Sequence, residues 1–451
     1  MLNLTVKQLR EKLKNKEITV VELVKAQLEQ IEKYDGLYNA YNSLNPDIMK
    51  RADGKFEVVA VAEPIDERRN YIKQKWNLPD SACFADYKPL LEKPKSADVA
   101  LICTMDRMHT EPALAAMDKK YDLLLEKPAA PTPEECLKIK ESAEKNGVKV
   151  LVCHVLRYTD FYTKIKETID SGKIGTVMSV HAAECVGNTH QSHSFVRGNW
   201  GNSEKSSCMI LQKCCHDMDI LQWLIGRKCK KVQSFGSLTY FTRENAPEGS
   251  PDYCYQGCPA GDTCPYNAVK LYYERKTNWF RRVAAKNPNP TDDDIMEAIK
   301  TTQFGKCVFK CDNNVVDHQV VNLEFDGGAV VSFNMCAFNE GGRSLKIMGT
   351  KGEITAYMDK KTFDLFDFET RTHTAVDVTD RNLDQSIVGG HGGGDEGIID
   401  ALYRYECGLN TDSKLSEIGI SVENHMIAFA AEKSRMTGKV VSPDEVMQGA
   451  R

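Results

Sequence analysis

Residues 99–128 read VALICTMDRMHTEPALAAMDKKYDLLLEKP, and this stretch decides the fold. Two short apolar runs, Val99–Cys103 and Leu123–Leu125, flank a helical pattern at His109–Lys119. Apolar runs of this length are typical of strands that are buried on both faces, as in a parallel sheet. The order strand, helix, strand therefore predicts a parallel β-α-β unit.

The same alternation continues on both sides of this unit. Apolar runs at Phe56–Ala62 (FEVVAVA) and Val148–Cys153 are separated from it by helical patterns at Ile65–Lys75 and Pro133–Asn146. Repeated alternation of strands and helices is typical of a doubly wound α/β domain with a parallel sheet. We therefore predict such a domain in the first third of the chain.

After about residue 154 the strands become longer and are joined by tight turns. Two hairpins are predicted, at Val320–Phe325 with Ala329–Met335 around Asp326-Gly327-Gly328, and at Ser344–Met348 with Glu353–Met358 around Gly349–Gly352. Consecutive hairpins predict an open, mostly antiparallel sheet, and helical patterns at Glu396–Tyr405 and Ile418–Thr437 follow it.

Composition limits the class of protein. The chain has 451 residues, of which 41% are hydrophobic and 27% charged, as in ordinary globular proteins. With 59 basic and 64 acidic residues, its net charge of −5 argues against nucleic-acid binding. No apolar run approaches the roughly 20 residues that cross a bilayer, and Met1–Lys16 lacks a signal-peptide pattern. We therefore expect a cytoplasmic protein, without a membrane partner, whose 16 cysteines are reduced.

Two residues are candidates for acid–base chemistry. Lys127 follows the strand Leu123–Leu125, and ligands bind beyond the carboxyl ends of such strands. A surface lysine in a loop is an equally good explanation of this position alone. His216 lies just before the apolar helix pattern Ile220–Ile225, and a histidine is suited to proton transfer near neutral pH. A single histidine is more often structural, but the two residues together favour the functional interpretation.

Three further patterns have weaker interpretations. Glu63 follows the strand Phe56–Ala62, where an acidic residue can bind the adenosine ribose of NAD rather than NADP, although an ordinary loop carboxylate also fits. The glycine-rich Gly389–Asp395 lacks a preceding strand and a lysine, so we favour an active-site loop with His391 over a phosphate cradle or a plain linker.

The third pattern is a group of cysteines with the spacings C-x3-C-x5-C and C-x3-C. Its members are Cys254, Cys258, Cys264, Cys307 and Cys311. Zinc sites use four soft ligands in short-spaced pairs, so Cys254, Cys258, Cys264 and Cys311 are candidate ligands for a structural zinc. Buried, reduced thiols are the alternative explanation, because paired CxxC units are missing.

Several stretches in a fixed order carry a resemblance to a known family. They are FEVVAVAEP, VALICTMDRMHTEPALAAM, LLLEKPAAPTPEE, HVLRY, SGKIGTV, CCHDMDI and LEFDGGAVVSF. Over about residues 55–440 the chain resembles the Gfo/Idh/MocA family, named after glucose-fructose oxidoreductase and inositol dehydrogenase. The resemblance implies a Rossmann-type parallel sheet, then an α+β domain whose open, mostly antiparallel sheet is used for contacts between subunits. It also implies an NAD-dependent oxidoreductase that acts on a sugar, cyclitol or glycoside hydroxyl.

The resemblance assigns roles to individual positions. Lys127 matches the lysine that acts at the reacting hydroxyl, and His216 matches the histidine that transfers its proton. Glu63 matches the ribose-binding acid, whereas Thr104, His109 and Glu126 match residues on the nicotinamide side. The substrate-pocket candidates are Arg157, Tyr158, His193, Arg197, Trp200, Lys213, Asp219 and His391. Gln212 stands where the family often has an aspartate, four residues before the histidine.

The N-terminus departs from this family, which begins with a strand and a G-x-G-x-x-G-type loop that holds the pyrophosphate. Before Phe56 the chain has only Gly36 and Gly54. Residues 1–47 instead resemble the N-terminal helices of the amidase family, especially the amidase-type subunit of glutamyl-tRNA amidotransferase, without its Ser-Ser-Lys machinery. We therefore expect a helical segment at 1–47, a Rossmann-type domain lacking its usual first strand at 48–153, and an α+β domain at 154–451.

Three functions remain in view. The first is the NAD-dependent oxidoreductase, with cofactor binding impaired by the missing loop. The second is a redox-assisted, NAD-dependent glycosidase that uses the same Lys127 and His216. The third is a non-catalytic or defective chimeric protein. For the enzymes we expect a carbohydrate-like small molecule as substrate and a homo-oligomer assembled through the open sheet.

Overall fold

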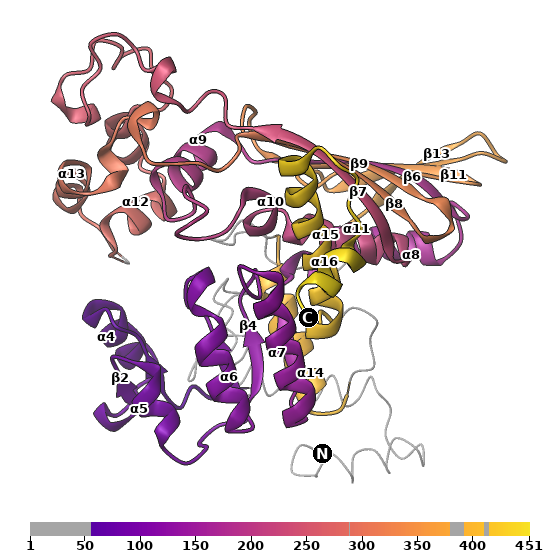
Figure 1. Ribbon diagram of the computed structural model, residues 1–451, viewed down its shortest axis with the longest axis horizontal. Helices are drawn as coiled ribbons and strands as arrows, with labels where there is room; N and C mark the ends of the chain where they lie inside the picture. The colour runs from indigo at the N-terminus through magenta and orange to yellow at the C-terminus, as the bar shows by residue number, and fades with distance from the viewer. Residues whose placement is uncertain (1–55, 288, 379–391, 410–414) are drawn as a thin grey trace, which may run out of the picture.

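The computed structural model describes residues 56–287, 289–378, 392–409 and 415–451 (Figure 1). The helices predicted within residues 1–47 and the candidate substrate residue His391 lie outside these ranges.

The predicted parallel sheet is present in the first domain. Strands β3 (Val99–Ile102), β4 (Asp122–Leu125) and β5 (Val150–Val152) pair in parallel in the order β3-β4-β5. Helices α6 (Thr110–Asp118) and α7 (Pro133–Asn146) connect these strands and lie beside β4 in Figure 1. The fold class expected from the alternating pattern, a Rossmann-type parallel sheet, is confirmed.

Side chains on alternate positions of β4 and β5 enter two different hydrophobic clusters. Leu123, Leu125 and Val152 pack into the cluster that includes α6 and α7, whereas Leu124 and Leu151 pack against α14 (Gly394–Glu406). Successive strand residues point to opposite faces, so a strand between two helical layers must be apolar throughout. This requirement explains the uninterrupted run of leucines in DLLL.

The strand predicted at Phe56–Ala62 is much shorter in the structure. Only β1 (Val61–Ala62) forms there, and it pairs in parallel with β2 (Cys83–Phe84). Helices α4 (Asp66–Lys75) and α5 (Tyr87–Glu92) accompany this pair, and Figure 1 shows α4, β2 and α5 as a lobe beside α6. A strand is stabilised by neighbours on both edges, and among the described residues β1 has a neighbour on only one.

The described residues of the first domain therefore contain two separate parallel sheets, β1-β2 and β3-β4-β5, and no hydrogen-bonded strand joins β1 to β3. The far edge of β5 is covered, because the backbone N–H of Val152 donates to the carbonyl oxygen of Ser416 at 2.9 Å. The outer edge of β3 is not covered in the described residues, and Leu101 on β3 is 47% exposed. In a complete Rossmann-type sheet the first, central strand lies at this edge, and the sequence analysis predicts that this chain lacks it.

The second domain contains an eight-stranded sheet with the order β13-β12-β11-β10-β6-β9-β8-β7. Its strands are β6 (Val177–Cys185), β7 (Cys229–Ser237), β8 (His318–Phe325), β9 (Val330–Cys336), β10 (Gly342–Gly349), β11 (Gly352–Tyr357), β12 (Thr362–Asp367) and β13 (His373–Asp377). All neighbours are antiparallel except β6 and β9. Both predicted hairpins, β8–β9 and β10–β11, are confirmed.

One face of this sheet is covered by helices and the other is open. Helices α8 (Asp160–Asp170), α11 (Cys215–Ile225), α15 (Ile418–Thr437) and α16 (Pro443–Gly449) lie on the covered face (Figure 1). Helix α15 packs on α7 as well as on β7, so it joins the two domains. The open face exposes apolar side chains such as Met178, Phe235 and Val330.

An insertion between β7 and β8 forms a smaller body with its own apolar core. It contains α12 (Asn278–Ala285) and α13 (Asp292–Thr301), and Figure 1 shows both at the end of the molecule opposite β13. The π-helical segment Gln191–Arg197 packs against this insertion. No helix in the described part of the chain is long and apolar enough to cross a membrane.

Candidate functional site

Lys127 connects the two domains at the carboxyl edge of the parallel sheet. It follows β4, and its Nζ donates to the main-chain carbonyl oxygen of Gln212 at 3.1 Å. Gln212 ends the short helix α10 (Met209–Gln212), directly before Lys213 and four residues before His216. The structure thus brings Lys127 to the segment that carries Lys213 and His216, although 85 residues separate Lys127 from Gln212.

A second histidine, which was not proposed from the sequence, lies beside His216. His154 is the second residue after β5, and its ring centroid is 5.9 Å from that of His216 and 5.5 Å from that of His425 on α15. Burial lowers the pKa of His154 to about 4, so its ring is neutral near pH 7. Neither ring nitrogen of His154 has a hydrogen-bond partner among the described residues. Buried polar atoms without partners are rare in proteins, and they often face a ligand or water.

Two other buried histidines hold the loop that contains Lys127. His425 accepts the backbone N–H of Ala129 at Nε2, at 3.0 Å, so its Nδ1 is the atom that donates to the carbonyl oxygen of Ser421 at 2.6 Å. On the other side of the loop, Nδ1 of His109 faces the carbonyl oxygen of Pro128 at 2.8 Å. The backbone directly after Lys127 is therefore fixed from two helices, and this restricts where the Lys127 ammonium can point.

The three residues expected on the nicotinamide side all lie near the carboxyl ends of β3 and β4. His109 is buried, and its Nε2 faces the carbonyl oxygen of Thr104 at 2.8 Å, so its ring bridges the two loops. The Thr104 hydroxyl donates to the carbonyl oxygen of Met108, and the Glu126 carboxylate accepts the backbone N–H of Lys127 at 3.2 Å. Thr104 and Glu126 keep side chains at the surface of this edge, whereas His109 lies beneath it.

Glu63 is placed at the carboxyl end of β1, as expected for a ribose-binding acid. Its Oε1 accepts the backbone N–H of Ile65 at 2.8 Å. The residues predicted for the ribose and for the nicotinamide side of a dinucleotide therefore lie at the carboxyl ends of strands in the first domain. Within the described residues, however, β1 is the first element, so no strand, glycine-rich loop and helix precede it, and in a Rossmann-type domain this first unit binds the pyrophosphate of a dinucleotide.

A buried network of four charged residues supports the segment around His216. The Lys213 ammonium lies 3.6 Å from the Glu184 carboxylate, and Arg343 pairs with both Glu184 and Asp217, the latter at 2.8 Å. Burial lowers the pKa of Lys213 and raises that of Asp217, while the opposite charges around each residue act against these shifts. Two cations balance two anions, and the network ties β6 and β10 to the residues on either side of His216.

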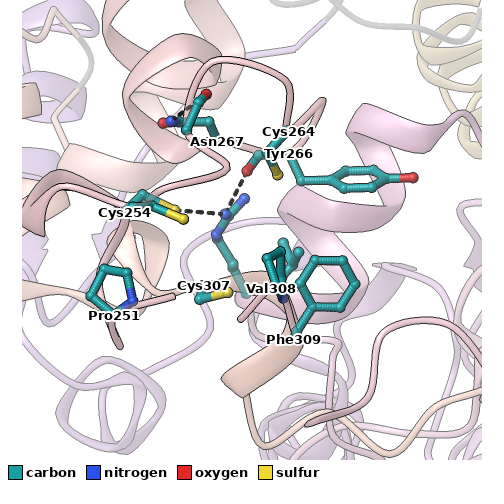
Figure 2. Close-up of a pocket in the computed structure, with 12 residues that line it drawn as sticks. Pro251, Cys254, Cys264, Tyr266, Asn267, Cys307, Val308 and Phe309 are labelled. Atoms are coloured by element: carbon teal, nitrogen blue, oxygen red, sulfur yellow. Dashed lines mark hydrogen bonds between the residues drawn. The ribbon is translucent and has the colours of Figure 1, made fainter. Parts of the chain in front are cut away.

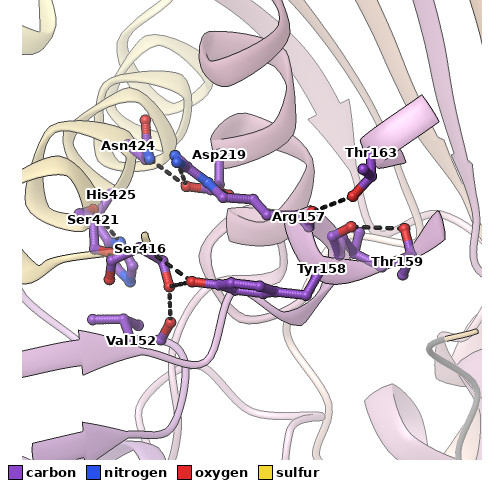
Figure 3. A network of polar contacts seen from close by, with 11 residues as sticks. Val152, Arg157, Tyr158, Thr159, Thr163, Asp219, Ser416, Ser421, Asn424 and His425 are labelled. Carbon is purple, nitrogen blue, oxygen red and sulfur yellow. Dashed lines mark hydrogen bonds and ion pairs between the residues drawn. The ribbon is translucent and has the colours of Figure 1, made fainter. Parts of the chain in front are cut away.

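Arg157, Tyr158 and Asp219, expected in the substrate pocket, are engaged in contacts within the protein (Figure 3). Arg157 donates from Nε and Nη2 to the two carboxylate oxygens of Asp219, at 2.6 and 2.7 Å. Asn424 donates a third hydrogen bond to Asp219, and the Tyr158 hydroxyl accepts the backbone N–H of Ser416 at 3.1 Å. All of these groups are buried, so they form a rigid support behind His154.

The remaining pocket candidates lie in different places. The Trp200 indole N–H donates to Asp106, in the loop after β3, at 3.3 Å, so Trp200 contacts the first domain. His193 is instead buried in the insertion, where Nδ1 pairs with the Tyr272 hydroxyl at 3.0 Å and the ring stacks on Phe280. Arg197 also has its contacts in the insertion, and the structure does not bring these two residues to Lys127.

The zinc predicted at the cysteine group is not supported. Cys254, Cys258, Cys264 and Cys307 line one pocket, shown in Figure 2, but no set of three or more histidine, cysteine or carboxylate side chains in the described residues could hold a metal ion. The physical reason is the Arg197 guanidinium, which reaches the Cys254 sulfur at 3.7 Å. A fixed positive charge beside the sulfur atoms opposes a cation, and spacing in the sequence could not reveal it.

Comparison with known proteins agrees with this architecture. Residues 37–154 match the model of an oxidoreductase family with an NAD-binding Rossmann fold, and residues 166–388 match the C-terminal alpha/beta domain of the same family. The chain is 26% identical to YteT of Bacillus subtilis, a presumed oxidoreductase, over 81% of this chain and 86% of YteT. It is 27% identical to an inositol 2-dehydrogenase of Salmonella paratyphi B, over 42% of this chain and 52% of that enzyme.

Solved structures show the same fold at low sequence identity. An oxidoreductase domain protein of Kribbella flavida has a TM-score of 0.63 and 16% identity, covering 90% of this chain and 96% of that one. A levoglucosan dehydrogenase in complex with NADH and levoglucosan has a TM-score of 0.60 and 16% identity, covering 86% and 90%. Because the two domain models together match about three quarters of the chain, the protein belongs to the Gfo/Idh/MocA family of oxidoreductases.

Proposed function

We propose that this protein is an NAD-dependent oxidoreductase acting on a hydroxyl-bearing carbon of a sugar, cyclitol or glycoside. The observation that carries the proposal is the contact of Lys127 with the carbonyl oxygen of Gln212, which joins the lysine of the first domain to the segment of His216. The names of the relatives, inositol 2-dehydrogenase and levoglucosan dehydrogenase, support the substrate class.

Within this proposal, Lys127 and His216 divide the proton chemistry. The Lys127 ammonium donates a hydrogen bond to the reacting hydroxyl oxygen and stabilises the negative charge that develops there. His216 accepts the hydroxyl proton, as a neutral imidazole can near pH 7. NAD, when bound, supplies the hydride acceptor. The buried Glu184, Asp217 and Arg343 network holds the segment of His216 in place.

His154 is suited to orienting the substrate in the same site. A neutral imidazole offers one donor and one acceptor, and a vicinal pair of hydroxyls on a polyol can satisfy both. The His154 imidazole is held between His216 and His425. It would therefore fix the orientation of the substrate's carbon atoms next to the reacting carbon. In this role His154 positions the substrate and does not transfer the proton.

Dinucleotide affinity is expected to be weak in this chain. Glu63, Thr104 and Glu126 are our candidates for the two ends of a dinucleotide, but no strand, glycine-rich loop and helix precede β1 in the described residues. A glycine-rich loop at a helix N-terminus normally provides these hydrogen bonds and the favourable dipole. The separation of β1 from β3 also favours the second candidate function, a non-catalytic chimeric protein.

The first experiment measures bound cofactor in the purified, full-length protein. Small molecules are released with acid and examined for NAD(H) and NADP(H) by mass spectrometry, and NADH is then titrated by fluorescence. Weak but saturable binding, with NADH formed from myo-inositol or levoglucosan, is the expected result. No binding at millimolar NADH would overturn the oxidoreductase proposal in favour of the non-catalytic one.

Three variants test the assigned roles. Lys127→Met and His216→Asn should each lower kcat/KM by about 10²- to 10⁴-fold, the usual contribution of acid–base catalysis, without changing NADH affinity. His154→Phe should raise KM for the polyol more than it lowers kcat. Release of free sugar from a glycoside without net formation of NADH would instead support the redox-assisted glycosidase.

A further inference from the structure

Five cysteines of the insertion lie around one buried arginine, away from the site described above. They are Cys254, Cys258, Cys264, Cys307 and Cys311. The two parts of the group are brought together by an antiparallel bridge between Tyr253 and Lys306, and by a hydrogen bond from the Cys307 N–H to the carbonyl oxygen of Asp252 at 2.8 Å. All five thiols are free of disulfide bonds.

The arginine at the centre of this group, Arg197, is only 2% exposed. Its Nε donates to the carbonyl oxygen of Lys306 and its Nη2 to that of Tyr266, each at 2.7 Å. Its Nη1 has no hydrogen-bond partner in the described part of the chain, and no carboxylate pairs with the guanidinium there. A buried charge without a counter-charge is strongly unfavourable, so a nearby group that can become negative is stabilised by it.

The Cys254 sulfur is the thiol in hydrogen-bond contact with this charge, at 3.7 Å from Nη2 of Arg197. Cys254 is also partly exposed, on the wall of the pocket in Figure 2, so a small reagent can reach it. A cysteine that is both accessible and next to an arginine is more reactive than an ordinary thiol, because the thiolate is the nucleophile.

We propose that this cluster is a redox-modification site, at which Cys254 is oxidised by a hydroperoxide and then forms a disulfide with another cysteine of the cluster. In the first step the Cys254 sulfur attacks one peroxide oxygen; an S–O bond forms, the O–O bond breaks, and hydroxide or alkoxide leaves. In the second step a neighbouring thiol attacks the sulfenic sulfur; an S–S bond forms and water leaves with the thiol proton. Two thiols thus provide the two electrons that reduce the peroxide.

The neighbouring thiols are less suited than Cys254 to react first with the peroxide. Burial raises the pKa of Cys264 and Cys307, so these sulfurs stay protonated near neutral pH and react slowly with peroxide. Cys264 and Cys307 line the same pocket as Cys254, so they are the candidates to attack a sulfenic sulfur on Cys254. The reaction is independent of NAD and of the proposed oxidoreductase function.

The test uses the reduced, full-length protein and hydrogen peroxide at less than one equivalent. Remaining thiols are trapped with N-ethylmaleimide and peptides are mapped by mass spectrometry. We expect a disulfide between Cys254 and a second cysteine of the cluster, with the intact mass lowered by two hydrogens. It should form about tenfold or more faster than oxidation of the exposed Cys407, because Arg197 lies in hydrogen-bond contact with Cys254 and a cysteine beside an arginine is more reactive than an isolated one.

Variants distinguish the charge effect from simple exposure. Cys254→Ser should abolish fast oxidation, Arg197→Gln should slow it, and Arg197→Lys should restore part of it, with folding checked by circular dichroism. If Arg197→Gln does not fold, Cys254→Ser and Cys407→Ser still decide the question. Oxidation of Cys407 before the cluster, or an unchanged rate in Cys254→Ser, would overturn the proposal. So would a tightly bound metal that protects all five thiols.

Discussion

Replacing Asp219 by alanine should destabilise the protein more than any substitution of an exposed ion pair. Asp219 receives both hydrogen bonds from Arg157 and one from Asn424, and the Arg157 side chain is only 2% exposed. The substitution leaves the guanidinium buried without its counter-charge. Breaking a buried pair in this way costs about 3–5 kcal/mol, out of a total stability that is typically about 5–15 kcal/mol.

Urea unfolding followed by fluorescence measures this effect. For a chain of this size the m-value is about 3 kcal/mol/M, so the midpoint should fall by roughly 1 to 2 M. Replacing both partners, as Arg157→Met with Asp219→Leu, should recover most of the loss, because no unpaired charge is then buried. The matched control is Asp312→Ala, which breaks the pair with Lys205, where both side chains are 67% exposed. Its midpoint should remain within experimental error of the parent.

One result would refute this reasoning. If Asp219→Ala shifts the midpoint no further than Asp312→Ala, the guanidinium of Arg157 must reach water after the substitution, and the support behind His154 is not rigid. A loss that the double replacement fails to recover would point instead to the shape of the site, and not to the buried charge.

Three further predictions concern pH, packing and assembly. Burial lowers the pKa of His154 to about 4 and that of His425 to about 3, below the value of 6.5 for an exposed histidine. As the pH falls through 6.5, the unfolded chain therefore binds more protons than the folded chain. The stabilisation that depends on these neutral histidines should therefore be fully present above about pH 6.5, and the free energy of unfolding should fall by about 2 kcal/mol per histidine between pH 7 and 5. Urea titrations at each pH measure this slope, and His154→Gln should reduce it. Gly397→Ala should lower the melting temperature, since a Cβ there would lie 2.7 Å from the carbonyl oxygen of Tyr158, whereas Gly419→Ala, with open space at its Cβ, should not. Light scattering should find an oligomer, and Phe235→Asp on the open sheet face should shift it toward the monomer; a monomeric parent protein would contradict this.

Local patterns predicted the helices and hairpins well because their causes are local. The helices at Pro133–Asn146 and Ile418–Thr437 begin and end at the predicted residues. In the first, Thr132 accepts the backbone N–H of Glu135, and Gly147 adopts the left-handed conformation that ends the helix. These signals lie within a few residues of the helix ends, so no knowledge of the rest of the molecule is needed.

The strand predicted at Phe56–Ala62 is much shorter in the structure, because strand formation depends on contacts that are not local. Its apolar pattern is that of a buried strand, but a strand forms only where other chain segments offer hydrogen bonds. In the described residues β1 pairs with β2 alone, over two residues. The loss of the central strand is a prediction from the lack of a glycine-rich loop before Phe56, whereas the short pairing of β1 with β2 could be found only from the structure.

The candidate site shows the same difference between local and long-range causes. The fold class could be predicted from the sequence alone, and so could the choice of Lys127 and His216 as candidates for acid–base chemistry, because each stands in a short motif next to a recognisable strand or helix. The tertiary structure was needed to show that Lys127 contacts the segment before His216 and that His154 lies beside His216. It also showed that Arg157 pairs with Asp219, and that Arg197 lies among the cysteines where a metal was expected. Hydrogen bonds and burial depend on segments that are distant along the chain. The spacing of residues within one segment therefore cannot predict which distant group will contact it.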